Sequence, residues 1–160
     1  MKIENNWISE TTGEKVEAFY EDIDNFSKLP QEKIKSICAF CYHDGRFVMV
    51  NNEGRWEPVA GHVEEGETDE EALIREIKEE SNMKVLKSFP IGYLYTQGQD
   101  IYQTRYFCLV EPFGPFLADP DGGVTEIQMI DSDKFLDFIK WGESAVKIKE
   151  QCLDIIQKIN

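Results

Sequence analysis

The stretch from Gly61 to Met83 constrains the fold most strongly, because it reads as a glycine-punctuated loop that continues into a capped helix. Thr68 is a good N-cap residue, and Glu71 three positions later completes a capping box. Asn82 can adopt the left-handed conformation in which many helices end. Between these ends an apolar stripe predicts a helix with one buried face; the stripe consists of Leu73, Ile74 and Ile77.

Three carboxylates share the flank of this helix beside the stripe, namely those of Glu76, Glu79 and Glu80. Side chains three and four positions apart are neighbours on a helix, so like charges there repel by roughly 0.2–0.5 kcal/mol per pair. No lysine stands at an offset that would relieve this repulsion, and helix geometry turns Arg75 about 100° away from Glu76. Such a flank is either a solvated acidic face or a site for a divalent cation, because hard cations take carboxylate ligands.

The spacing of these residues resembles the Nudix box, written G-x5-E-x7-R-E-U-x-E-E-x-G-U, where U is an aliphatic residue. The matching positions are Gly61, Glu67, Arg75, Glu76, Ile77, Glu79, Glu80 and Met83. Asn82 stands where the family has glycine, and asparagine is the next best residue for a left-handed C-cap. The resemblance implies a single Nudix domain over residues 1–160, with an α+β fold in which a mixed β-sheet is sandwiched between helices (α/β/α).

A Nudix hydrolase cleaves a nucleoside diphosphate linked to another group X, by attack of water on phosphorus. X is phosphate in nucleoside triphosphates, including oxidised ones, and a sugar in compounds such as ADP-ribose. Because a diphosphate is strongly anionic, we expect Mg2+, or Mn2+, as the cofactor that neutralises this charge. The alternative is a catalytically inactive Nudix-like module that binds nucleotides or a protein partner, and the intact carboxylates argue against it.

The resemblance also implies roles for individual residues of the box. The expected metal ligands are the carboxylates of Glu76, Glu79 and Glu80 and the carbonyl oxygen of Gly61. Arg75 is expected to orient a carboxylate such as that of Glu67 through a charge-assisted hydrogen bond, a role that is structural as well as catalytic. The general base is left open among Glu76, Glu79 and an acid from a later loop.

Two residues outside the box are further candidates for the site. In many Nudix proteins an acid that follows the central strands joins the metal site. Glu126, on a strand predicted over residues 124–130, is the first choice, and Asp121, in the preceding loop rich in Pro and Gly, is the second. Arg105 stands in a long stretch without another basic residue, so it is a candidate for binding a substrate phosphate. The alternative for Arg105 is a surface or ion-pair arginine.

Residues 1–33 are expected to form a helical extension, and residues 34–160 the Nudix core with C-terminal helices. The extension is predicted from apolar residues at helical spacing, which are Val16, Phe19, Tyr20, Ile23 and Phe26. This helix would pack on the core or a partner subunit, or form a lid over the substrate site. In the core, strands are predicted at 34–42, 46–50, 85–95, 101–110 and 124–130, with a hairpin turn at Asp44-Gly45, and helices after residue 131 and over 145–159.

The net charge of −14 makes DNA or RNA polymers unsuitable partners, because an acidic protein repels a phosphate backbone. A small phosphorylated nucleotide stays compatible with this charge if metal ions carry the positive counter-charge. The chain has no apolar run of membrane-spanning length and begins with polar residues, so we expect a cytoplasmic protein with no membrane partner. A monomer and a homodimer both remain open.

The cysteines raise the question of a zinc site, because Cys38 and Cys41 have C-x2-C spacing and His43 follows. This pair lies in a predicted strand, where residues three apart point to opposite faces. No second close pair follows along the chain. We therefore expect all four cysteines to be buried free thiols, which also fits a reducing compartment.

Overall fold

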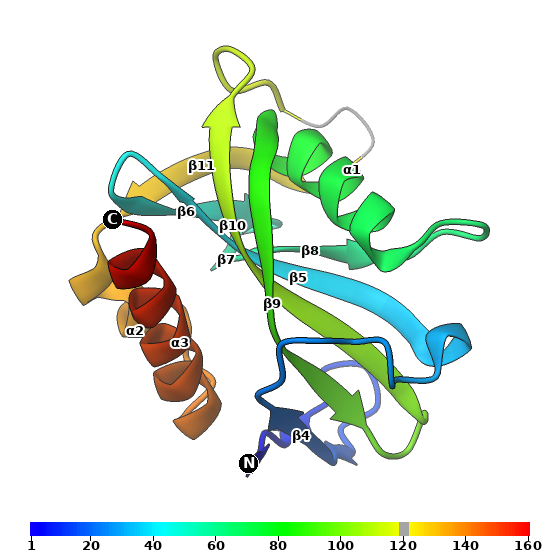
Figure 1. The fold of residues 1–160 in the computed structure, drawn as a ribbon. Helices are drawn as coiled ribbons and strands as arrows, with labels where there is room; N and C mark the ends of the chain where they lie inside the picture. Colours follow the sequence, from blue (N-terminus) through cyan, green and yellow to red (C-terminus); the bar gives the residue numbers. More distant parts are fainter. Residues whose placement is uncertain (119–121) are drawn as a thin grey trace.

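The computed structural model describes residues 1–118 and 122–160 (Figure 1). Its strands are β1 (Lys2–Glu4), β2 (Trp7–Ile8), β3 (Lys15–Val16), β4 (Ala18–Glu21), β5 (Ile34–His43), β6 (Arg46–Asn52), β7 (Arg55–Glu57), β8 (Val59–His62), β9 (Met83–Thr96), β10 (Ile101–Pro112) and β11 (Val124–Ile130). Its α-helices are α1 (Asp69–Ser81), α2 (Phe135–Phe138) and α3 (Glu143–Ile159), and the short 3-10 helices are η1 (Gln31–Lys33) and η2 (Ser132–Lys134).

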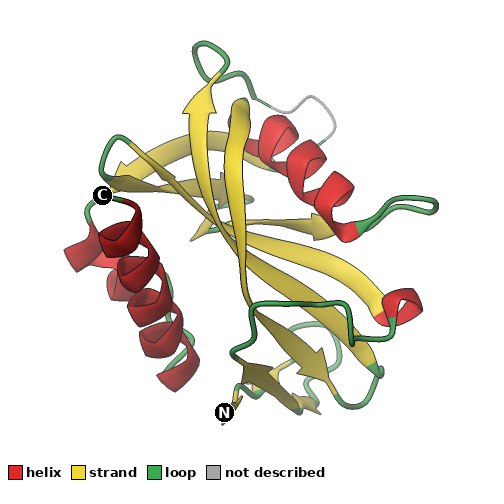
Figure 2. Cartoon of the chain, in the orientation of Figure 1, coloured by secondary structure: helices red, strands yellow, loops and turns green. Residues whose placement is uncertain are grey.

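The main sheet has the strand order β1-β4-β9-β10-β5-β6-β11, with β7 added to β6 and β8 added to β5. Strands β10 and β5 are parallel, whereas the other neighbouring pairs of this sheet are antiparallel. Helix α1 lies on one face of the sheet, and α2 and α3 lie on the other (Figure 2). The predicted α+β sandwich with a mixed sheet is therefore confirmed.

The strands predicted in the core are all present, as β5, β6, β9, β10 and β11, and each is at least as long as predicted. Asp44 and Gly45 join β5 to β6, with φ of 50° and 77°. Positive φ at both central residues is what a type I′ turn requires, and this turn matches the twist of the strands it joins. Because aspartate and glycine adopt positive φ more readily than most residues, an Asp-Gly pair is a strong sequence signal for such a hairpin turn.

Strand β5 supplies both cores of the molecule through its alternating side chains. Ile37, Ala39 and Cys41 pack beneath α1, whereas Cys38 and Phe40 pack against the α2 and α3 layer. Cys38 and Cys41 therefore face opposite sides of the sheet, as predicted. All four cysteines are free and buried, so the predicted thiols are confirmed.

The helical extension predicted for residues 1–33 is wrong, because this segment forms β1 to β4 and η1. Ala18 and Tyr20 are buried while Phe19 is half-buried, which is the period of a strand. Strand β4 adds to the edge of β9 (Figure 1), and the Tyr20 hydroxyl donates to the Ile91 carbonyl at 3.1 Å. Pairing with an existing sheet edge therefore overrides the helical spacing of the apolar residues.

Two apolar stripes also differ in detail from the prediction. On α1 the buried residues include Ala72, Leu73 and Ile77, whereas Ile74 is 55% exposed. Ile74 lies about 100° around the helix from Leu73, which turns it away from the buried face. On α3, the apolar residues at helical spacing predict one buried stripe from Ala145 to Ile159. Ala145, Ile148 and Cys152 are buried, whereas Ile159 in the last turn is exposed. No helix in the described residues is long and apolar enough to cross a membrane.

Candidate active site

Helix α1 is held at both ends by the residues predicted to cap it. The Thr68 hydroxyl accepts from the Glu71 backbone N–H at 3.1 Å, and Glu71 Oε1 accepts from the Thr68 N–H at 3.0 Å. At the other end, Asn82 has φ 54° and ψ 42°, the left-handed conformation expected for it. Its side-chain amide also donates to the Pro115 carbonyl at 2.9 Å. Asparagine therefore closes the helix as glycine would and adds a bond to the following loop.

Arg75 ties the loop before α1 to the helix. Its Nε donates to Glu67 Oε2 at 2.7 Å and its Nη2 to Glu67 Oε1 at 3.0 Å, a bidentate pair. Nη2 also donates to the His62 carbonyl at 2.9 Å. The hydrogen bonds from Arg75 lower the pKa of Glu67 to about 2. The predicted contact between Arg75 and Glu67 is therefore confirmed.

Arg75 also contacts the acidic flank, which contradicts the expectation that helix geometry would turn it away. Its Nη1 donates to Glu76 Oε1 at 2.8 Å and to Glu79 Oε2 at 3.2 Å. The long side chain of arginine reaches neighbours that its Cα position alone would exclude. The guanidinium therefore offsets part of the repulsion among the carboxylates.

Strand β8 lies close against the same flank. A methyl group built on Gly61 would lie 2.2 Å from Glu76 Cδ and 2.4 Å from its Oε1, so the carboxylate occupies the space that a side chain at 61 would need. One residue earlier, the Ala60 N–H points to Glu80 Oε1 at 3.4 Å. The structure thus brings together Gly61, Glu67, Arg75, Glu76 and Glu79, with Glu80 beside them.

Glu126 lies on β11, is exposed and accepts from Asn51 Nδ2 at 3.0 Å. Its neighbours Ile127 and Met129 pack toward the α1 side. Strand alternation therefore directs Glu126 to the opposite face. Among the described residues it makes no hydrogen bond or ion pair to α1. Asp121 lies outside the described residues.

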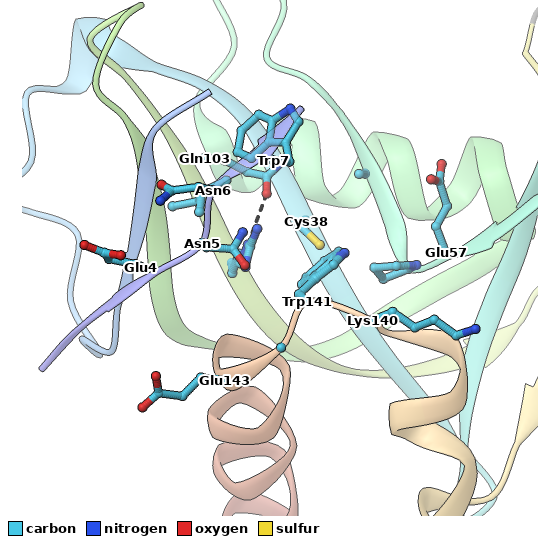
Figure 3. Close-up of a pocket in the computed structure, with 15 residues that line it drawn as sticks. Glu4, Asn5, Asn6, Trp7, Cys38, Glu57, Gln103, Lys140, Trp141 and Glu143 are labelled. Carbon is cyan, nitrogen blue, oxygen red and sulfur yellow. Dashed lines mark hydrogen bonds between the residues drawn. The ribbon is translucent and has the colours of Figure 1, made fainter. Parts of the chain in front are cut away.

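Arg105 is 3% exposed, so the alternative of a surface arginine is wrong. Its guanidinium lies 4.4 Å from the Trp141 ring centre, and its Nε donates to Gln103 Oε1 at 3.1 Å. Arg105 lines a cavity of about 660 Å3 on the α3 side of the sheet (Figure 3). Trp7 and Trp141 also line this cavity, and nothing in the local sequence pattern marks them, because they meet only when β2 and the α2–α3 connection pack on the sheet.

The comparison with protein families decides what this arrangement belongs to. The model of the NUDIX domain matches residues 33–150, which is most of the chain. The chain belongs to the Nudix family. The matching region contains the loop, α1 and Arg105, whereas β1 to β4 precede it.

Among the proteins similar to this Nudix chain are one relative in sequence and two solved structures with a similar fold. It is 31% identical over 87 residues to a putative mutator protein, MutT4, of Mycobacterium tuberculosis, a match that covers 51% of this chain and 35% of that protein. The Bacillus subtilis pyrophosphohydrolase BsRppH has a similar fold, with a TM-score of 0.69, 18% identity and coverage of 93% and 95% of the two chains. A Caenorhabditis elegans Ap4A hydrolase follows with a TM-score of 0.59, 13% identity and coverage of 77% and 99%.

The oxygen atoms on the Nudix helix fit a hard divalent cation in their chemistry. In the described part of the chain, no three acidic, cysteine or histidine side chains already surround a point that could hold a metal ion. Arg75 Nη1 contacts both Glu76 and Glu79 instead. The absence of a side chain at Gly61 lets the Glu76 carboxylate lie against the β8 backbone. Because Arg75 contacts one oxygen atom of each carboxylate, Oε1 of Glu76 and Oε2 of Glu79, these carboxylates could hold a cation without losing Arg75.

The bidentate pair predicts a pH-dependent contribution to stability. Because the pKa of Glu67 falls from 4.5 to about 2 on folding, the pair stabilises the fold above about pH 4.5 and loses this effect between pH 4.5 and 2. Glu67→Gln should therefore lower Tm at pH 7, and the gap from wild type should narrow as the pH falls toward 2. Thermal melts across this range measure the gap, with Glu65→Gln in the same exposed loop as control. A gap that does not change with pH would contradict the assignment.

Proposed function

We propose that this protein is a divalent-cation-dependent pyrophosphohydrolase. Its substrate is a nucleoside diphosphate linked to another group X, and water attacks phosphorus. The observation that carries the proposal is the joint placement of Gly61, Arg75 and Glu76, since the Glu76 carboxylate fills the gap at Gly61 while Arg75 contacts it. The names of the relatives agree in class, because two of them are described as a pyrophosphohydrolase and an Ap4A hydrolase.

The residues of the box have distinct tasks in this proposal. Glu76, Glu79, Glu80 and the Gly61 carbonyl would hold Mg2+ or Mn2+, which when bound neutralises phosphate charge and lowers the pKa of a water molecule. Arg75 and Glu67 keep the loop and the helix in register, so that the carbonyl and the carboxylates face one site. Either Glu76, Glu79 or an acid beyond residue 110 takes the proton from the attacking water.

Binding without turnover is the second candidate function. The acidic flank alone favoured an enzyme, because unpaired like charges are costly to keep. Arg75 lowers that cost through its contacts with Glu76 and Glu79, so a binding module could retain these residues. The two functions therefore have to be separated by experiment.

The test is hydrolysis of a substrate panel with Mg2+ and with EDTA. The panel contains nucleoside triphosphates, nucleotide sugars and dinucleoside polyphosphates, and chromatography measures the nucleoside monophosphate released. We expect release from at least one compound with Mg2+ and none with EDTA. Nucleotide binding without turnover of any compound would support the binding module instead.

An acid from the region around β11 is proposed to assist this reaction, and Glu126 is tested for this role although its strand position directs it away from α1. If Glu126 reaches the bound substrate, Glu126→Gln should lower kcat by about tenfold, a loss of about 1.4 kcal/mol in transition-state stabilisation, with a modest change in KM. The substituted amide oxygen can still accept from Asn51, so the strand should keep its structure. Steady-state kinetics of Glu126→Gln beside Asp121→Asn measures the effect. If only Asp121→Asn is slow, the loop acid has the role, and if neither is slow, the acids of the box carry the chemistry.

A further inference from the structure

The cavity beneath Trp141 is built largely from residues outside the Nudix box (Figure 3). One wall comes from the N-terminal residues Asn5, Asn6 and Trp7, which precede the region matched by the family model. In Figure 3 these residues lie on one side of the cavity, and Glu57 and Lys140 lie on the other. A volume of about 660 Å3 is in the range of cavities that bind small ligands.

The three amide side chains that line the cavity have their oxygen atoms engaged by the chain itself. Asn5 Oδ1 accepts from the Ser144 hydroxyl at 2.8 Å, and Asn6 Oδ1 accepts from the Ala18 N–H at 3.0 Å. Gln103 Oε1 accepts from Arg105 Nε. Within the described residues, none of the three side-chain NH2 groups donates a hydrogen bond. These three side chains therefore offer mainly hydrogen-bond donors to the cavity.

Arg105 adds the strongest of these donors. Its Nη1 is buried and has no hydrogen-bond partner among the described residues. A buried donor without an acceptor costs free energy, so a ligand acceptor that reaches Nη1 by displacing the side chains that cover it would recover this cost. The guanidinium lies against the Trp141 ring, and Trp7 stands 41% exposed at the same cavity, so flat aromatic surfaces adjoin the donors.

The charges around the cavity favour a neutral ligand over an anion. Three carboxylates line it, those of Glu4, Glu57 and Glu143, against the two cations Arg105 and Lys140. A phosphate group would meet this excess of acid in a protein whose net charge is −14. A neutral ring that carries acceptor atoms gains the donors and the stacking without that repulsion.

We infer that this cavity binds the base of the substrate and selects a 6-oxopurine, guanine or hypoxanthine. Both bases present two acceptors, O6 and N7, on one edge, which is the pattern that arginine reads in DNA. Adenine places a 6-amino donor beside N7, where it would face the donors of Gln103 and Arg105. The inference rests on the proposed function, because it assumes that the substrate is a nucleotide.

The position of β8 connects this cavity with the acidic flank. Ala60 lines the cavity, while its backbone N–H points to Glu80 Oε1. A nucleotide whose base lies in this cavity can therefore extend its phosphates past β8 toward the carboxylates of α1. The base subsite and the reaction site thus share one strand as their boundary.

The test is binding of phosphate-free nucleosides in EDTA, which needs neither metal nor turnover. Titration calorimetry should show that guanosine and inosine bind at least tenfold more tightly than adenosine. Pyrophosphate, the probe for an anion site, should not compete with guanosine. Equal binding of guanosine and adenosine, no binding of guanosine, or displacement by pyrophosphate would each overturn the inference. Metal-dependent hydrolysis in the substrate panel would still stand in those cases, so the two proposals can fail separately.

Gln103→Glu tests the donors directly. The new carboxylate keeps an oxygen for Arg105 Nε and gains an ion pair, so Tm should stay the same or rise. It replaces the NH2 donor by an acceptor that faces O6 and N7, so guanosine binding should weaken at least tenfold while adenosine binding does not. Gln157 is exposed near the end of α3, so Gln157→Glu makes the same charge change away from the cavity. It should leave the binding of guanosine and of adenosine unchanged. An unaltered ratio of guanosine to adenosine affinity in Gln103→Glu would contradict the inference.

Discussion

Glu79→Gln is expected to lower kcat by at least a hundredfold, which corresponds to about 2.7 kcal/mol of transition-state stabilisation. The substitution removes a charged metal ligand but little volume. Glu79 is 46% exposed, and an amide oxygen can still accept from Arg75, so the helix should stay folded. Rate measurements at saturating Mg2+ on the best substrate of the panel measure the loss, and circular dichroism checks the fold.

Glu70→Gln is the matched control for this substitution. It makes the same change of charge on α1, but Glu70 is an exposed residue in the first turn and does not contact Arg75. We expect kcat within about twofold of wild type and a small fall in Tm, because an acid in the first turn of a helix stabilises it by roughly 0.3–1 kcal/mol. Near wild-type turnover of Glu79→Gln would remove Glu79 from the mechanism.

Gly61→Ala is expected to reduce kcat by a hundredfold or more through Glu76. The added methyl group would lie between 2.2 and 2.6 Å from the Glu76 carboxylate atoms, so the carboxylate must leave its place against β8. The atoms that must move are the far end of a flexible side chain, which limits the effect on Tm. Kinetics and thermal melts of the same preparation separate the two effects. Gly98→Ala is the control, because its methyl group meets nothing within 4 Å.

A double-mutant cycle tests whether Gly61→Ala acts through Glu76. If the methyl group displaces the carboxylate, Glu76→Gln should cost much less in the Gly61→Ala background than in wild type. Additive losses would show that the two residues act independently. Wild-type activity of Gly61→Ala would show that the position of the carboxylate against Gly61 does not matter for turnover.

The sequence by itself determined the elements whose signals are local. Thr68, Glu71 and Asn82 set the ends of α1, because the hydrogen bonds that cap the helix span only a few residues. The Asp44-Gly45 turn specifies the hairpin of β5 and β6 for the same reason. The Nudix box could also be recognised from the sequence, since its acids and Arg75 lie on one helix and the loop before it.

The tertiary structure decided what depends on partners far along the chain. Residues 1–33 have apolar spacing that suits a helix, and the free edge of β9 made β4 a strand. The contacts of Arg75 with the acidic flank depend on the length of its side chain and on the position of Glu67. Helix geometry alone does not predict either of these.

Arg105 shows the same limit most clearly. Its place in the sequence suggested a contact with a substrate phosphate or a surface ion pair. In the structure β10 is a central strand, and its alternation buries Arg105 under Trp141 on the face away from α1. The donors around it come from β10 and from the N-terminal segment, which meet only in the folded chain. Local hydrogen bonds and residue spacing depend on residues close together in the sequence. The sheet face on which a side chain lies, its burial and its contacts depend on packing between distant elements.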